Sequence, residues 1–224
     1  ALSYISLGRN NGSSHARNVG IGNARGDILF FLDSDVILNN SYFQHHWAIH
    51  SAAYKASKNA VVVGFAENID HNDAHIAHLV DGADIQPDIA LDFRFYDDGT
   101  DWFPARPESR LMDETNRFTR FDVKGYTLPD MVVTHNISTP RGAVNAMNGF
   151  EERFDEHGWG YEDTFFGAKA MGMGYYIIPC TATGVFKIQH SPRIQGDTSE
   201  QCHKNGEVYQ ELLDQPLAEL ESTA

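Results

Sequence analysis

Short apolar runs alternate with an amphipathic stretch over the first part of the chain. Ile28 to Leu32 is a continuous apolar run, which is typical of a strand covered on both faces of a parallel sheet. The apolar spacing from about His15 to Ala24 predicts a helix that Gly26 ends, and Leu2 to Leu7 predicts an earlier strand. This order of strand, helix and strand is half of a doubly wound sheet, in which ligands bind beyond the carboxyl ends of the strands.

The same pattern predicts elements along the rest of the chain. Helices are expected at Asn40–Ser57, Arg141–Met147, about Glu162–Met171 and Glu200–Leu213, and strands at Ala60–Glu67, Met131–Ser138, Tyr175–Pro179 and Thr183–His190. Asp81 to Lys124 contains prolines, glycines and many charges, and is predicted to be an irregular insertion that faces the substrate. His45, His46 and His50 are expected on a solvated helix face.

The net charge of the chain limits the classes of partner that we expect. The 224 residues carry a formal net charge of -14, and because they contain no basic stripe, nucleic acid is not expected as a partner. No apolar stretch reaches the roughly 20 residues that span a bilayer, and no signal peptide is visible. With only Cys180 and Cys202 present, a reduced cytoplasmic chain is expected. Since the chain opens on a predicted strand, its natural N-terminus is expected to lie upstream.

Two carboxylates follow the first apolar run, Asp33 and Asp35 in the sequence DSD. Residues i and i+2 of an extended backbone point to the same side, so these carboxylates can share one cation. Hard divalent ions such as Mg2+ and Mn2+ bind carboxylates together with substrate phosphates. The alternative is an acidic loop or helix start after the strand, in which Ser34 or Asp35 acts as a cap.

A second candidate site is the sequence GWGYED. The glycines beside Trp159 predict a mobile loop that carries one large aromatic face, suited to stacking on a sugar ring. Glu162 and Asp163 follow where a helix begins. They either complement the helix dipole, or one binds substrate hydroxyls while the other accepts a proton.

A third candidate is His190, at the end of a predicted strand. A neutral imidazole is a good ligand for Mn2+. A structural or surface histidine is the alternative at such a position.

Three segments, in this order along the chain, resemble the nucleotide-sugar-dependent glycosyltransferases of the GT-A fold. The segments are SSHARNVGIGNARGDILFFLDSD, NGFEERFDEHGWGYEDTFFGAKAMGMG and IQHSPR. They are similar to family 2 and to the related galactosyltransferase and chondroitin-polymerase group. The resemblance implies an α/β, Rossmann-like fold with a mostly parallel central sheet flanked by helices, which lacks its first strand-helix units here. Residues 1–224 are expected to form one domain, with a nucleotide-binding part (1–60), a variable insertion (61–130) and an acceptor and catalytic part (131–224).

The resemblance also implies a role for each candidate residue. The metal ligands would be Asp33, Asp35 and His190; substrate would be bound by Arg17, Asn18, Asp33, Trp159 and Glu162; Asp163 would be the general base, beside Glu162. The cofactor would be Mn2+ or Mg2+. The donor would be a nucleoside-diphosphate sugar, most simply a UDP-sugar, and the acceptor a glycan, lipid or peptide. The order of Glu162 and Asp163 is similar to that of the inverting members, so inversion at the anomeric carbon is expected.

Two departures from the family pattern leave alternatives open. The upstream strand-helix units are absent from this sequence, and Tyr161 stands where the galactosyltransferase group has glycine. A non-catalytic sugar- or partner-binding relic of a transferase is one alternative. A phosphatase of the haloacid-dehalogenase type is another, although Ile37 stands where that class has threonine or valine.

Overall fold

The computed structural model describes residues 3–70, 76, 120–123, 126–189 and 198–215. Its α-helices are α1 (Ser13–Asn23), α2 (Tyr42–Lys55), α4 (Arg141–Ala146), α5 (Glu162–Gly172) and α6 (Ser199–Leu213). Its strands are β1 (Ile28–Leu32), β2 (Val36–Leu38), β3 (Ala60–Val63), β4 (Ala66–Asp70), β5 (Arg120–Val123), β6 (Tyr126–Thr127), β7 (Asn136–Pro140), β8 (Tyr176–Pro179) and β9 (Val185–Gln189). Three 3-10 turns, η3 (Leu128–Met131), η4 (Glu152–Glu156) and η5 (Thr181–Thr183), complete the described elements.

The central sheet has four strands in the order β1-β7-β3-β8. β1 and β3 both run antiparallel to β7, and β8 runs parallel to β3, so β1, β3 and β8 share one direction. A smaller sheet has the order β2-β9-β4. It receives the chain directly from β1 and β3, so the two sheets meet at the end of β1 where Asp33 and Asp35 lie.

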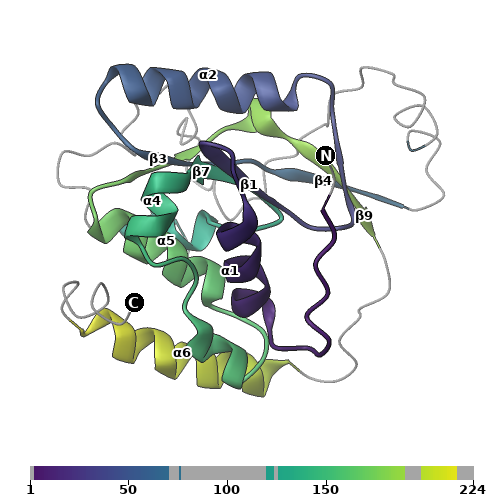
Figure 1. Cartoon of the computed structure of the whole chain (residues 1–224). Helices are drawn as coiled ribbons and strands as arrows, with labels where there is room; N and C mark the ends of the chain where they lie inside the picture. Colours follow the sequence, from purple (N-terminus) through teal and green to yellow (C-terminus); the bar gives the residue numbers. More distant parts are fainter. Residues whose placement is uncertain (1–2, 71–75, 77–119, 124–125, 190–197, 216–224) are drawn as a thin grey trace.

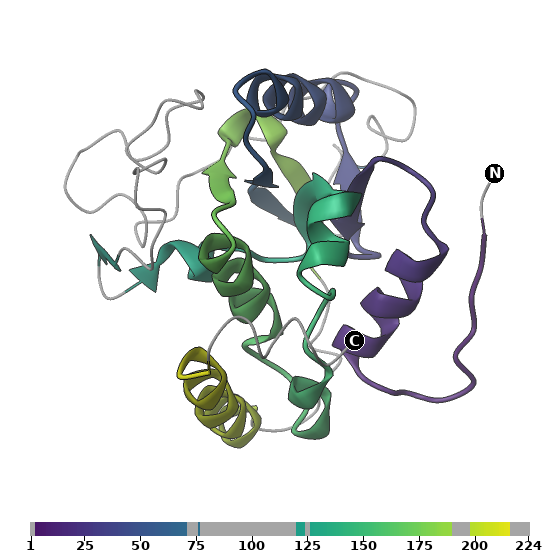
Figure 2. The same ribbon diagram turned by 60° about the vertical axis from the view of Figure 1, so that its left-hand side comes forward.

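Helices cover both faces of the central sheet, as the sequence predicts. Figure 1 shows α2 along one face and α4 and α5 against the other. The side chains of β3 alternate accordingly: Val61 and Val63 pack in the core on the α4 and α5 side, and Ala60 and Val62 pack in the core on the α2 side. Figure 2 shows α6 beyond α5, away from the sheet. Among the described helices, none is long and apolar enough to cross a membrane.

The N-terminal segment differs from its prediction. Residues 3–7 form no strand, and Tyr4 is 90% exposed; a strand is not stable without a partner for its backbone groups. In the described residues β1 pairs only with β7. Leu29 is therefore the one residue of β1 that is fully buried, whereas the apolar run predicts burial on both faces.

The predicted strand Ala60–Glu67 is divided between the two sheets at Gly64. The Gly64 amide donates to the Asn136 carbonyl oxygen. A side chain at Gly64 would meet the Asn136 amide at 2.2 Å and the Thr183 carbonyl oxygen at 2.4 Å. Only glycine therefore lets the chain pass from β3 to β4 at this crowded point.

Two histidines of α2 are buried, contrary to the predicted solvated face. His46 and His50 contact the Ser138 hydroxyl at 2.6 and 2.8 Å. Burial lowers the pKa of His46 to about 3 and that of His50 to about 4. Both rings are thus neutral near pH 7 and act as polar links between α2 and β7.

We expect Gly64→Ala to reduce the free energy of unfolding by at least about 2 kcal/mol, because the added methyl group overlaps backbone and amide atoms that have no room to move. Gly142→Ala in α4 is the matched control, since a methyl group there meets no atom within 4 Å, and alanine favours the helix. Urea unfolding of the two variants measures the difference. Equal stability of the two variants would contradict this account of Gly64.

Candidate active site

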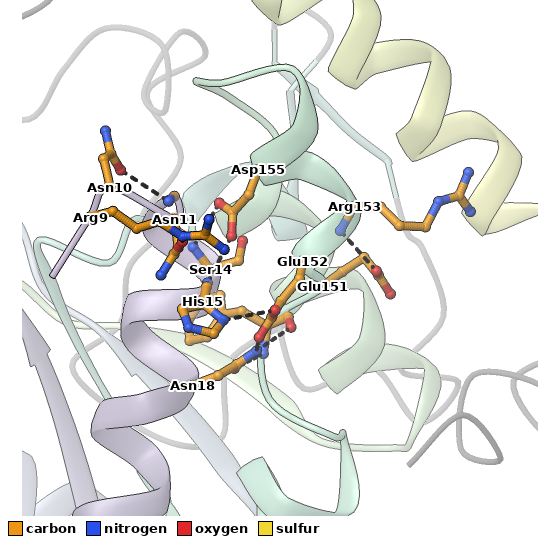
Figure 3. Close-up of polar contacts among 12 residues, drawn as sticks. Arg9, Asn10, Asn11, Ser14, His15, Asn18, Glu151, Glu152, Arg153 and Asp155 are labelled. Carbon is orange, nitrogen blue, oxygen red and sulfur yellow. Dashed lines mark hydrogen bonds and ion pairs between the residues drawn. The ribbon is translucent and has the colours of Figure 1, made fainter. Parts of the chain in front are cut away.

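The N-terminus of α1 is held by a distant carboxylate. Asp155 in η4 accepts hydrogen bonds from the backbone amides of Ser14 and His15, at 3.0 and 2.8 Å (Figure 3). Gly12 has a φ of 97°, and any side chain there would collide with Asp155. The carboxylate thus caps the helix and fixes α1 against the segment that precedes the acidic pair Glu162 and Asp163.

Asn18 makes a second link between the same elements. Its side-chain amide donates to the Phe150 carbonyl oxygen and to Glu152, both at 2.9 Å, and its oxygen accepts from the Phe150 amide at 2.8 Å. Figure 3 shows Asn18 pointing from α1 toward Glu152. The hydrogen bonds of the Asn18 side chain are therefore made to the segment before α5. A contact between Asn18 and a nucleotide stays a prediction.

Arg17, one position earlier, reaches the acidic pair. Its Nη1 lies 3.2 Å from Glu162 Oε1 and 3.2 Å from Asp163 Oδ1. The Ser13 hydroxyl also donates to Glu162 Oε1 at 3.2 Å, and the Arg17 guanidinium lies over the Phe150 ring. One helix, α1, thus supplies both the cation and the hydroxyl that hold Glu162.

Asp163 is held from the opposite side by the segment that enters β7. Its Oδ2 accepts from the Thr134 amide at 3.0 Å and from the Thr134 hydroxyl at 3.1 Å. Burial raises the pKa of Asp163 to about 6; Glu162 raises it further, while Arg17 and the Thr134 hydrogen bonds act in the opposite direction. A carboxylate with this pKa is mostly ionised above neutral pH yet more basic than an ordinary aspartate, as a general base requires.

The DSD carboxylates lie at the end of β1, where the two sheets meet. Asp33 forms an ion pair with Lys187 of β9, with Nζ to Oδ2 at 2.8 Å. The Asp35 carbonyl oxygen accepts from the Ile188 amide at 2.9 Å. The pairing of β2 with β9 therefore places Lys187 at the DSD end, in contact with the Asp33 carboxylate.

His135 belongs to the same group of side chains. Burial lowers its pKa to about 4; Lys187 adds to this effect, and Asp33 and Asp35 oppose it. Its Nε2 is buried with no hydrogen-bond partner among the described residues. His135 thus provides a neutral ring nitrogen near both carboxylates.

A cleft of about 420 Å³ lies along β1. Arg17, Asp33 and Thr134 line it together with the whole of β1 and residues in and just after the last turn of α1. Arg17 and Thr134 are also the residues that hold Asp163, so Asp33 and the two partners of Asp163 line the same cleft. Thr134 and His135, adjacent in the chain, connect the DSD end with Asp163.

The tryptophan loop is tied to α6. Gln201 accepts from the Trp159 amide at 3.0 Å, and Asn205 donates to the carbonyl oxygens of Gly158 and Gly160, at 3.3 and 2.9 Å. These bonds hold the loop that the sequence predicts to be mobile. Trp159 is 54% exposed, so its ring is available for a ligand.

The structure places the predicted catalytic residues Glu162 and Asp163 against Arg17, and the predicted metal ligands Asp33 and Asp35 at the end of β1. His190 lies outside the described residues. Within the part of the chain that the structure describes, no three His, Cys, Asp or Glu side chains are grouped to hold a metal ion. Ser13, Thr134, His135 and Lys187 are site residues that the sequence reasoning missed. Lys187 carries one signal, a charge inside the otherwise apolar run VFKI.

Comparisons with known proteins find sequence similarity to glycosyltransferases. The family model for "Glycosyl transferase family 2" matches residues 2–139. The uncharacterized glycosyltransferase YfnE of Bacillus subtilis (strain 168) is 28% identical over 191 residues, which cover 75% of this chain and 45% of that protein.

Solved structures show the same fold. S. aureus TarS 1–349 matches with a TM-score of 0.53 at 15% identity, over 96% of this chain and 50% of that chain. Its complex with UDP-GlcNAc matches with a TM-score of 0.55 at 13% identity, over 94% and 50%. The chain therefore spans about half the length of the proteins it matches.

The raised pKa of Asp163 can be tested through the pH dependence of the free energy of unfolding. The folded protein holds this proton to a higher pH than the unfolded chain, whose aspartate has a pKa near 3.8. The contribution of protonated Asp163 to stability is therefore complete below about pH 4 and is lost as the pH rises through about 6. Asp163→Asn imitates the protonated form, so this variant should gain stability relative to wild type between pH 4 and 8, as measured by urea unfolding. A difference that does not change with pH would contradict this environment for Asp163.

Proposed function

The chain belongs to glycosyl transferase family 2, and from this membership we propose that it transfers a sugar from a nucleoside-diphosphate sugar to an acceptor hydroxyl. The observation that supports the proposal is a cleft lined both by Asp33 of the DSD sequence and by Arg17 and Thr134, the two residues that hold Asp163. Sugar transfer requires that the negative charge on the departing diphosphate is stabilised and that the acceptor hydroxyl loses its proton. The DSD carboxylates and the acidic pair of α5 supply one site for each requirement.

On the donor side, we assign Asp33 and Asp35 to the diphosphate. The structural neighbour TarS was solved in complex with UDP-GlcNAc, which supports a UDP-sugar as the donor. Arg17 and Asn18 lie on the face of α1 that borders the site. Arg17 is 20% exposed and lines the cleft, so it remains accessible to an anionic ligand.

The residues at the DSD end fit a divalent metal ion in their chemistry. Carboxylates that act together with the oxygens of a substrate diphosphate suit Mg2+ or Mn2+, and Asp33 lines the cleft in which such a substrate could bind. We therefore propose Mn2+ or Mg2+ as the cofactor, held by Asp33 and Asp35, with His190 as the expected further ligand. When bound, such an ion stabilises the charge that develops on the leaving diphosphate.

On the acceptor side, Trp159 offers an exposed face on which a sugar can stack, and buried Glu162 is placed to accept hydrogen bonds from sugar hydroxyls. Asp163 acts as the general base that removes the proton from the attacking hydroxyl. Its raised pKa makes it more basic than an ordinary carboxylate. A single displacement, with Asp163 and the leaving diphosphate on opposite sides of the sugar, would invert the anomeric centre, as the order of Glu162 and Asp163 implies. A glycan, lipid or peptide acceptor is compatible with these roles.

Membership of family 2 argues against the phosphatase alternative, which the DSD motif alone left open. The non-catalytic alternative makes a different prediction for Asp163. A binding module catalyses no reaction and needs no general base. Loss of this carboxylate would then have no catalytic effect.

A pair of variants separates the two acidic sites. Asp35→Ala should abolish the binding of UDP in the presence of Mn2+, measured by calorimetric titration with GDP for comparison. Asp163→Asn should bind UDP within about twofold of wild type but lower kcat by about 10²–10⁴, the usual contribution of a general base. Glu156→Gln is the control, because Glu156 is an exposed carboxylate of η4, and it should keep full activity.

Two outcomes would contradict the proposal. Wild-type protein that binds UDP but transfers no sugar to any acceptor would favour the non-catalytic alternative. A product of retained anomeric configuration, determined by NMR of the glycoside formed, would exclude Asp163 as the base of a single inverting displacement.

A further inference from the structure

Lys187 is fixed beside the DSD carboxylates by backbone pairing on both of its sides. β9 is the central strand of the smaller sheet. In that sheet, Lys187 lies opposite Val36 of β2 and Asn68 of β4. The Ile188 amide bonds the Asp35 carbonyl oxygen directly. The position of the Lys187 ammonium group is thus set by the sheet, and its neighbour Asp33 is set by the end of β1.

The ion pair between Lys187 and Asp33 can be exchanged at small cost. Its Nζ to Oδ2 distance is 2.8 Å, but the two side chains remain 29% and 40% exposed. Pairs that stay in contact with water contribute little to stability, so this one has little structural purpose to explain it. The position of this pair is more informative, since Asp33 lines the cleft together with Arg17 and Thr134.

The charges of the group point to an anionic ligand. Asp33 and Asp35 carry two negative charges, and Lys187 carries one positive charge. A divalent cation would turn the net negative charge of this group into a net positive one. A diphosphate then meets both the cation and a lysine, whose ammonium group is a common phosphate-binding group.

We propose that Lys187 is a second cation of the donor site, which pairs with Asp33 in the donor-free protein and transfers to the donor's diphosphate when Asp33 binds the metal ion. This inference rests on the proposed function, because it requires that the DSD end binds a nucleoside diphosphate. It adds Lys187 to the residues that bind the donor. Lys187 competes with the metal ion for Asp33 in the absence of donor, and it strengthens donor binding in the presence of metal.

Two titrations on Lys187→Gln test the exchange. Binding of Mn2+ alone, followed by the EPR signal of the free ion, should become about tenfold tighter, since Asp33 no longer has a competing partner. Binding of UDP at saturating Mn2+, followed by calorimetry, should become about tenfold weaker, the fold-change expected for the loss of one charge-assisted hydrogen bond. Lys187→Arg keeps the charge and should keep most of the UDP affinity.

Lys204→Gln is the matched control. Lys204 is a half-exposed lysine of α6 that pairs with Glu200 at 2.7 Å, so this variant changes the net charge equally away from the site. Both of its affinities should stay within about twofold of wild type.

The opposite signs of the two shifts separate this role from a structural one. Damage to the smaller sheet in Lys187→Gln would weaken both affinities together, and that result, or no change in UDP affinity, would overturn the inference. Failure of the wild-type protein to bind UDP with Mn2+ would instead contradict the proposed function on which the inference rests.

Discussion

The presence of two pairs of carboxylates, each pair close in the sequence, is the constraint on which the rest of this structure depends. Asp33 and Asp35 follow β1, and Glu162 and Asp163 begin α5. Like charges this close repel one another and raise the cost of ionisation. The chain meets this cost with one cation for each pair, Lys187 from β9 and Arg17 from α1. The fold can be understood as the means of bringing these two cations to the two pairs.

Each cation is positioned by contacts between segments far apart in the sequence. α1 is attached to the segment before α5 through Asp155 and Asn18 (Figure 3), and Arg17 lies between these attachments. β9 receives its place from β2 and β4 on either side. Thr134 and His135 then connect the two pairs from the start of β7. A displacement of α1 would leave the largely buried Glu162 and Asp163 without Arg17, which is costly.

Local patterns were sufficient to predict much of this arrangement. The boundaries of β1 follow the apolar run before Asp33, and the start of α5 follows the acidic residues at its first turn. The partners of these acids were not predictable in the same way. Lys187 and Asp33 are separated by 154 residues, and only strand pairing reveals that they meet. The burial of His46 depends likewise on Ser138, and the change of sheet at Gly64 depends on the crowding of Asn136 and Thr183. Residues 3–7 form no strand although their composition suits one, because a strand also needs a neighbour.

The central claim is that the donor's diphosphate and its metal ion bind at the DSD end, beside the acidic pair of α5. Paramagnetic broadening of backbone amide signals by Mn2+ in the presence of UDP tests this most directly, because the effect falls steeply with distance from the ion. The account predicts that the amides of Asp35, His135 and Ile188 broaden first, Thr134 and Asp163 next, and Val208 on α6 not at all. Broadening centred on any other part of the chain, or none at saturating UDP and Mn2+, would contradict it.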